Sequence, residues 1–153
     1  MRALWAAIPF LAWAAVANGQ ANPAGRPVRD ITALAGAWNG SHLEQRQSCR
    51  ASQNNGFHGT YSEYGIFVDT VGHSIVVNEA GITGLTCTWT GQYRDDDGQM
   101  RITGTLSCSD GRMGTFDARG FFVLATMMSM RLNVQLSGSE SCSIDAILSG
   151  ARF

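Results

Sequence analysis

The residues best suited to chemistry are histidines and an alternating polar run. The candidate bases are His42, His58 and His73. They fall on different predicted strands or loops, whereas an enzyme needs a nucleophile beside a base, or a bound metal. The run from His42 through Glu44 to Arg46 is in phase with Trp38, so it could line a polar pocket. The alternative, which we favour, is a bulge at Gly40 that turns the strand outward. We therefore predict no enzymatic activity.

Two further runs carry atoms that bind metals. Met127-Met128-Ser129-Met130 could hold Cu(I) through thioethers, but alternation places Met128 and Met130 in the core as fillers. Asp95-Asp96-Asp97-Gly98 is similar in composition to a calcium loop, but a tight hairpin there cannot wrap an ion. The cysteines lie too far from one another and from histidine for a zinc site. We predict no metal and no cofactor.

The four cysteines are predicted to form two disulfides. Asp97-Gly98 indicates a two-residue hairpin, because a type I′ turn needs positive φ at both central positions. Counting outward from this turn places Cys87 opposite Cys108 at a non-hydrogen-bonded pair, where Cα atoms approach to about 4.5 Å. The other bridge would join Cys49 to Cys142, although four cysteines allow three connectivities.

Eight strands are predicted, separated by turn signals rich in Gly, Asn and Asp. They lie near 36–48, 59–68, 73–79, 84–94, 99–108, 113–124, 127–136 and 142–152. The connection near Ala125-Thr126 lacks a turn signal. The hairpin register places Gly91 opposite Gly104, which indicates a close backbone approach. Since no segment has a helical period with caps, the predicted fold class is all-β.

Short strands joined by short turns form either a sandwich or an up-and-down barrel, and the ends of the chain favour the barrel. Antiparallel pairing of the first and last strands places Trp38 opposite Arg152. With one bulge, the same pairing brings Cys49 beside Cys142. In a barrel of eight antiparallel strands these two strands are neighbours, so the disulfide would staple the closure.

The first 17 residues have the layout of a secretory signal peptide. Arg2 supplies the positive start, and Ala15-Val16-Ala17 is a small-x-small cleavage site after an apolar run too short for a comfortable membrane span. Residues 18–30 are rich in Pro, Gly and Asn, and we expect a loose tail before a barrel domain at 31–153. A leader with paired cysteines predicts a periplasmic or secreted protein, and the composition favours a bacterial source.

The charge balance argues against some classes of binding partner. The chain has 11 arginines, no lysine and 12 acidic residues. A weakly acidic chain without a basic patch argues against nucleic acid or an anionic membrane as a partner. After the leader, no segment is long and apolar enough to span a bilayer.

The segment Leu34-Ala35-Gly36-Ala37-Trp38 resembles the G-x-W motif on the first strand of the calycins, the lipocalin and avidin barrels. In that family an Arg or Lys on the last strand packs across the Trp, and Arg152 is the matching residue here. The resemblance implies a calycin-like eight-stranded barrel in which Trp38 and Arg152 are structural residues. The same segment, after a short tail, also resembles the bacterial periplasmic metalloprotease inhibitors. In that family the tail enters the protease cleft, and the corresponding stretch here is Asn18 to Thr32.

Two functions remain. The first is a non-enzymatic module that binds a small, mostly apolar ligand at the barrel mouth, with a wall formed by Trp89, Tyr93, Tyr61 and Phe116. Eight strands leave an interior either filled by side chains or hollow enough for one small ligand, and this stays open. The second is an inhibitor of an exported hydrolase that acts through the tail or the longest loop, 50–59. The predicted contacts in that loop are Arg50, Asn54, Asn55 and Phe57.

Overall fold

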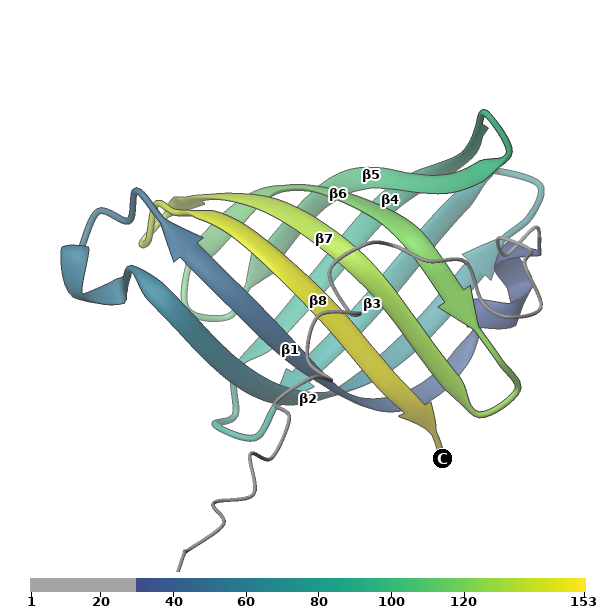
Figure 1. The fold of residues 1–153 in the computed structure, drawn as a ribbon, viewed down its shortest axis with the longest axis horizontal. Helices are drawn as coiled ribbons and strands as arrows, with labels where there is room; N and C mark the ends of the chain where they lie inside the picture. The colour runs from purple at the N-terminus through teal and green to yellow at the C-terminus, as the bar shows by residue number, and fades with distance from the viewer. Residues whose placement is uncertain (1–29) are drawn as a thin grey trace, which may run out of the picture.

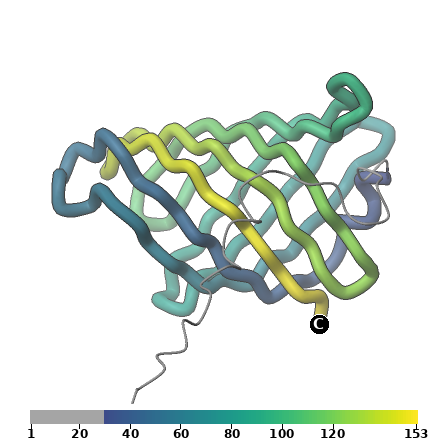
Figure 2. Tube along the Cα trace, in the orientation of Figure 1, coloured from purple at the N-terminus to yellow at the C-terminus, as the bar shows by residue number. Residues whose placement is uncertain are grey.

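The computed structural model describes residues 30–153, which form a closed barrel of eight antiparallel strands (Figure 1). The strands are β1 (Gly36–Gln47), β2 (Gly56–Asp69), β3 (Ser74–Gly81), β4 (Thr86–Asp96), β5 (Gln99–Cys108), β6 (Arg112–Val123), β7 (Met127–Gly138) and β8 (Ser143–Arg152). Each strand pairs with the next along the chain, and β8 returns to pair with β1, as the trace in Figure 2 shows. The predicted all-β, eight-stranded barrel is confirmed.

The barrel has two unlike ends (Figure 1). Four connections, 48–55, 82–85, 109–111 and 139–142, lie at one end with both disulfides, and we call it the disulfide end. The other end holds three connections and a short 3-10 helix, η1 (Ile31–Leu34), and we call it the helix end. Asp30 caps η1, because its carboxylate accepts a hydrogen bond from the backbone N–H of Thr32 at 2.9 Å.

The hairpin of β4 and β5 has the predicted register. Asp97 and Gly98 have φ values of 54° and 78°, the positive values that the turn requires. Cys87 pairs with Cys108, and the two form a disulfide with Cα atoms 4.0 Å apart. Gly104 lies deeper in the same hairpin, where an added Cβ would collide with the backbone of β4. The close backbone approach predicted there is therefore present.

The pairing of β1 with β8 closes the barrel. Its register runs without interruption from Trp38 opposite Arg152 to the end of β1. Ser48 then adopts a φ of 53°, and it is the extra residue that lets Cys49 reach Cys142, with Cα atoms 4.1 Å apart. The second predicted disulfide is confirmed, and the irregularity that reconciles it with the strand register lies at Ser48.

Two predictions about β1 and β2 are wrong. β2 begins at Gly56 instead of near 59, because Asn54-Asn55-Gly56 ends a short 3-10 turn, η2 (Ser52–Asn54), instead of forming the middle of a longer loop. Phe57 therefore lies on β2 and not in the loop. The bulge expected at Gly40 is also absent, since Gly40 pairs in regular register with both neighbouring strands. The polar run that follows Gly40 consequently keeps the inward phase of Trp38.

The start of the chain is described in part. The predicted signal peptide, residues 1–17, lies outside the described residues, as does the predicted tail, 18–30, except for Asp30. Ile31 and Thr32, which the resemblance to protease inhibitors assigned to the inserting tail, form part of η1, and Ile31 is buried in the core. Within residues 30–153 no helix has the length and apolarity that a membrane crossing needs.

Removing the Cys49–Cys142 bridge is expected to destabilise the barrel more than removing Cys87–Cys108. The bridges span sequence separations of 93 and 21 residues. In the chain-entropy account these loops correspond to about 4–5 kcal/mol and about 3 kcal/mol of unfolding free energy. Urea unfolding of the double variants Cys49→Ala/Cys142→Ala and Cys87→Ala/Cys108→Ala measures both losses. A larger loss from opening the shorter loop would contradict the expectation.

Candidate functional site

The helix end of the barrel is closed by packed side chains. Trp38 is fully buried, and its indole N–H donates to the carbonyl oxygen of Leu34 at 2.8 Å. The guanidinium carbon of Arg152 lies 4.4 Å from the centre of the Trp38 ring. The same guanidinium donates to the carbonyl oxygens of Ala33 and Ala35 at 2.8 and 3.2 Å. Trp38 and Arg152 together hold η1 across this end.

An apolar cavity lies in the middle of the barrel. It measures about 50 Å³. Its lining consists of Leu34, His42, Tyr64, Ile66, Ile75, Val77, Trp89, Ile102, Phe116, Ala118, Met128, Met130, Leu132 and Leu148. Typical ligand pockets measure about 300–1,000 Å³, and an apolar cavity of about 150 Å³ holds benzene. The interior is therefore nearly filled, and a ligand larger than a few heavy atoms requires side chains to move.

Two of the four predicted wall residues line this cavity. Trp89 and Phe116 meet edge to face with ring centroids 5.3 Å apart. The prediction is wrong for Tyr61, which is 45% exposed on the outer face because it has the opposite phase to the buried Tyr64. Tyr93 is half-buried but outside the cavity lining, since it lies towards the helix end with its hydroxyl donating to the carbonyl oxygen of Asp69 at 3.3 Å.

The methionine run behaves as core filling. Met128 and Met130 are 2% and 8% exposed and line the cavity, whereas Met127 is 55% exposed at the start of β7. Methionine is unbranched and adapts its shape readily, so these two side chains are the part of the wall best able to yield to a ligand.

A hydrogen-bonded polar network fills the part of the interior nearer the disulfide end. Arg46 Nε donates to Glu44 Oε2 at 2.8 Å, and His42 Nδ1 lies 3.4 Å from Glu44 Oε1. His42 Nε2 lies 2.6 Å from the hydroxyl of Tyr64. Because the carboxylate can only accept, the ring proton belongs on Nδ1, and Nε2 then accepts the phenol proton. The side chains form one relay from Arg46 to Tyr64.

The electrostatics of the relay keep Glu44 ionised and Tyr64 protonated. Burial by itself would raise the pKa of Glu44, but the hydrogen bond from His42 and the charge of Arg46 outweigh it and lower this pKa from 4.5 to about 2. Burial raises the pKa of Tyr64 well above its ordinary value, and the nearby Glu79 carboxylate raises it further. Tyr64 therefore stays protonated and donates its phenol proton to His42 Nε2.

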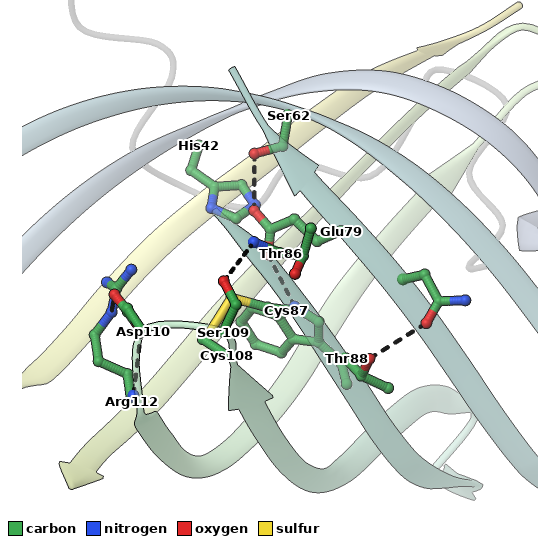
Figure 3. Close-up of a disulfide and its surroundings, with 12 residues drawn as sticks. His42, Ser62, Glu79, Thr86, Cys87, Thr88, Cys108, Ser109, Asp110 and Arg112 are labelled. Carbon is green, nitrogen blue, oxygen red and sulfur yellow. Dashed lines mark hydrogen bonds and ion pairs between the residues drawn. A yellow bond between two sulfur atoms is a disulfide. The ribbon is translucent and has the colours of Figure 1, made fainter. Parts of the chain in front are cut away.

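Glu79 on β3 belongs to a second polar group near the Cys87–Cys108 disulfide. One carboxylate oxygen accepts from the Ser62 hydroxyl at 2.8 Å, and the other accepts from the Trp89 indole N–H at 2.8 Å. Figure 3 shows the Ser62–Glu79 hydrogen bond beside the disulfide. Ser62 is buried, while Glu79 and Trp89 are half-buried. Glu79 therefore ties the polar part of the interior to the wall of the apolar cavity.

These polar residues were not among the site residues predicted from the sequence. The signal for His42, Glu44 and Arg46 was present, since they alternate in phase with Trp38, but it was assigned to an outward bulge. Glu79 shares the phase of the inward Ile75 and Val77, but the neighbouring apolar Val76 leaves that phase ambiguous in the sequence. The other two histidines lie elsewhere, His58 against the carbonyl oxygen of Asn54 at 2.9 Å and His73 against Tyr93.

The loop between β1 and β2 is held in shape at several points. Asn55 Oδ1 accepts a hydrogen bond from the backbone N–H of Cys49 at 3.0 Å, and the Asn54 amide donates to Glu140 at 2.7 Å. These two asparagines, predicted as partner contacts, serve to fold the loop. Arg50, also predicted, has an exposed side chain while its backbone N–H donates to Ser141 at 2.8 Å.

The predicted contact Phe57 belongs to an apolar patch on the outer wall. Phe57 and Leu43 are 75% and 60% exposed, and Tyr61 and Ile147 are each 45% exposed. Leu43 pairs with Ile147 on β8 and with Gly59 on β2, so the four side chains surround Gly59. A Cβ built on Gly59 would meet nothing within 4 Å, so the centre of this β1–β2–β8 patch is open. Such a cluster exceeds the scattered single apolar residues that are normal on a surface.

The low pKa of Glu44 predicts acid-dependent stability. Because this pKa is about 2 in the folded protein and 4.5 ordinarily, the ionised carboxylate stabilises the fold above pH 4.5. That contribution, about 3 kcal/mol in size, is lost as the pH falls from the higher value through the lower one. Urea unfolding at pH 6 and pH 2 should therefore show a large gap between wild type and Glu44→Gln that closes in acid. A gap independent of pH would contradict this, and Glu63→Gln on the outer face is the control.

Comparisons with known proteins show a structural likeness and no sequence relative. No protein-family model matches the sequence, and no curated protein matches it. The barrel is similar to a solved structure from Nostoc punctiforme PCC 73102, described as a protein with unknown function from the DUF3598 family. The two chains are 12% identical with a TM-score of 0.46, and the match covers 84% of this chain and 51% of the other. This chain therefore spans about half the length of that protein, and the likeness carries no argument about function.

Proposed function

We propose that this protein is a non-enzymatic binding module that takes a small, mostly apolar ligand into the barrel from the disulfide end. The observation that carries the proposal is the apolar cavity, which Trp89 and Phe116 line on one side and the adaptable Met128 and Met130 line on another. A concave apolar site with a few polar groups at its edge is the usual form of a small-molecule site. We place the entrance at the disulfide end because η1, Trp38 and Arg152 cover the helix end, and a ligand entering there must displace side chains of the polar network.

The cavity size limits the ligand. At about 50 Å³ it accepts a chain of a few carbon atoms, and a longer ligand must displace a methionine. The barrel and the Trp38–Arg152 contact favour a calycin-like protein, a family of ligand-binding barrels, and we make that assignment as part of the proposal. Two disulfides favour a periplasmic or extracellular site of action.

Neutral n-alkanols of increasing length test the proposal. We expect 1-butanol to bind. For longer alkanols, each added carbon atom should increase the affinity less, because the cavity is small. Isothermal titration calorimetry and native mass spectrometry measure these affinities. Ala118→Val adds two carbon atoms at a buried cavity-lining position and should weaken binding at least fivefold, through loss of roughly 1 kcal/mol of apolar contact. Ala151→Val, the same change at an exposed position, is the matched control. Absence of binding by every alkanol would overturn the proposal.

A second candidate function is inhibition of an exported hydrolase through the outer wall and the adjoining loop. The β1–β2–β8 patch favours it, since an open apolar cluster beside a loop fixed by the Cys49–Cys142 disulfide is a rigid surface suited to a protein partner. In this arrangement Phe57 is the anchor and Arg50 lies on the neighbouring loop.

Inhibition assays against a panel of purified exported proteases test this second function. Phe57→Ala should weaken inhibition roughly tenfold or more, because large aromatic anchors dominate protein interfaces. Phe67→Ala is the matched control, since Phe67 is 60% exposed on the same strand but outside the patch. Deletion of residues 18–30 distinguishes inhibition by the predicted tail from inhibition by the patch, because it removes the tail alone. Undiminished inhibition by the Phe57 variant would exclude the patch as the inhibitory surface.

A further inference from the structure

Glu79 is a carboxylate inside the barrel that is held by neutral donors. Its two oxygens accept from the Ser62 hydroxyl and the Trp89 indole, each at 2.8 Å. Among the described residues no arginine or histidine lies within ion-pair distance of it. Glu44, the other interior carboxylate, is paired with Arg46 at 2.8 Å. The half-buried carboxylate of Glu79 is therefore without a counter-charge in the described part of the chain.

Glu79 is also within reach of a ligand. Ser62 is buried beneath it at 3% exposure, whereas Glu79 and Trp89 are both half-buried. Trp89 lines the apolar cavity, and its indole N–H contacts Glu79 directly. A small molecule that enters from the disulfide end can therefore contact the carboxylate with one end and the cavity with the other.

The surrounding side chains favour a positive charge over a negative one. Trp89 donates its indole N–H to Glu79, and Tyr64 is the cross-strand neighbour of Glu79 on β2, so neither places a positive charge beside the carboxylate. Arg46 is the nearest interior cation along the relay, and its guanidinium is engaged by Glu44. A carboxylate ligand would thus meet Glu79 with no free cation to receive it, which is unfavourable for like charges.

We propose that the barrel selects a small organic cation, an alkylammonium whose nitrogen pairs with Glu79 beside Trp89 and whose short apolar chain enters the cavity. This inference rests on the proposed ligand-binding function, and it adds the charge class of the ligand. Three probes have similar short alkyl groups and differ in charge: butylammonium, 1-butanol and butanoate. Their affinities distinguish the contribution of the charge from that of the alkyl group.

The experiment titrates each probe into the oxidised protein and follows the indole N–H resonances by NMR. The Trp89 N–H, which donates to Glu79, should shift with butylammonium, while the Trp38 N–H, bound to Leu34, serves as an internal reference. We expect butylammonium to bind about tenfold more tightly than 1-butanol, because its ammonium group forms a charge-assisted hydrogen bond with the Glu79 carboxylate. Butanoate should bind most weakly.

Glu79→Gln should weaken butylammonium binding about tenfold, to the level that the same variant shows for 1-butanol. Glu63→Gln is the matched control, because Glu63 is an exposed glutamate that pairs with Ala80, next to Glu79, on the outer face of the wall. A salt titration tests the proposal without a variant. Added sodium chloride should weaken the binding of butylammonium and leave the binding of 1-butanol unchanged.

The outcomes separate the two proposals. Equal binding of butylammonium and 1-butanol to wild type would overturn the charge selection while leaving the proposed function in place. An equal loss of both probes in Glu79→Gln, or salt-independent butylammonium binding, would also overturn the charge selection. If none of the three probes binds, the proposed function fails together with the inference.

Discussion

The pairing of β1 with β8 is the constraint on which the rest of this structure depends. It closes the sheet and places Arg152 opposite Trp38 at the helix end, where the guanidinium holds η1 in position. At the other end the same register brings Cys49 to within bridging distance of Cys142. Since side chains alternate between the faces of a strand, a slip of one residue would turn Trp38 outward and with it the whole polar run that follows.

Closure of the barrel also determines which side chains fill its interior. The inward side chains of β5 to β8 are apolar, from Ile102 to Leu148, while the polar interior groups come from β1, β2 and β3. The two interior carboxylates have different hydrogen-bond partners. Glu44 is compensated by Arg46, and Glu79 is held by the neutral donors Ser62 and Trp89. The interior is therefore asymmetric in both polarity and charge, and the proposed selection of a ligand by its charge rests on this asymmetry.

The same wall presents two different surfaces. Its inner face is tightly filled around a cavity of about 50 Å³, and its outer face over β1, β2 and β8 leaves an apolar patch around Gly59. The Cys49–Cys142 disulfide restrains the loop between β1 and β2 at the disulfide end. A small rigid barrel of this kind loses little conformational entropy when it binds, which suits either a small ligand inside or a protein outside.

Local signals in the sequence determined the eight strands, the hairpin of β4 and β5, both disulfides and the pairing of Trp38 with Arg152. Period-two alternation and turn chemistry act over a few residues, and an antiparallel register then propagates from a single turn such as Asp97-Gly98. The tertiary structure decided which face of each strand turned inward where both faces carried suitable residues. Tyr61 and Tyr64 have opposite phases, and the polar run after Gly40 was compatible with either direction. The size of the cavity and the contacts of Glu79 likewise depend on packing between strands far apart in the chain, which a local pattern does not contain.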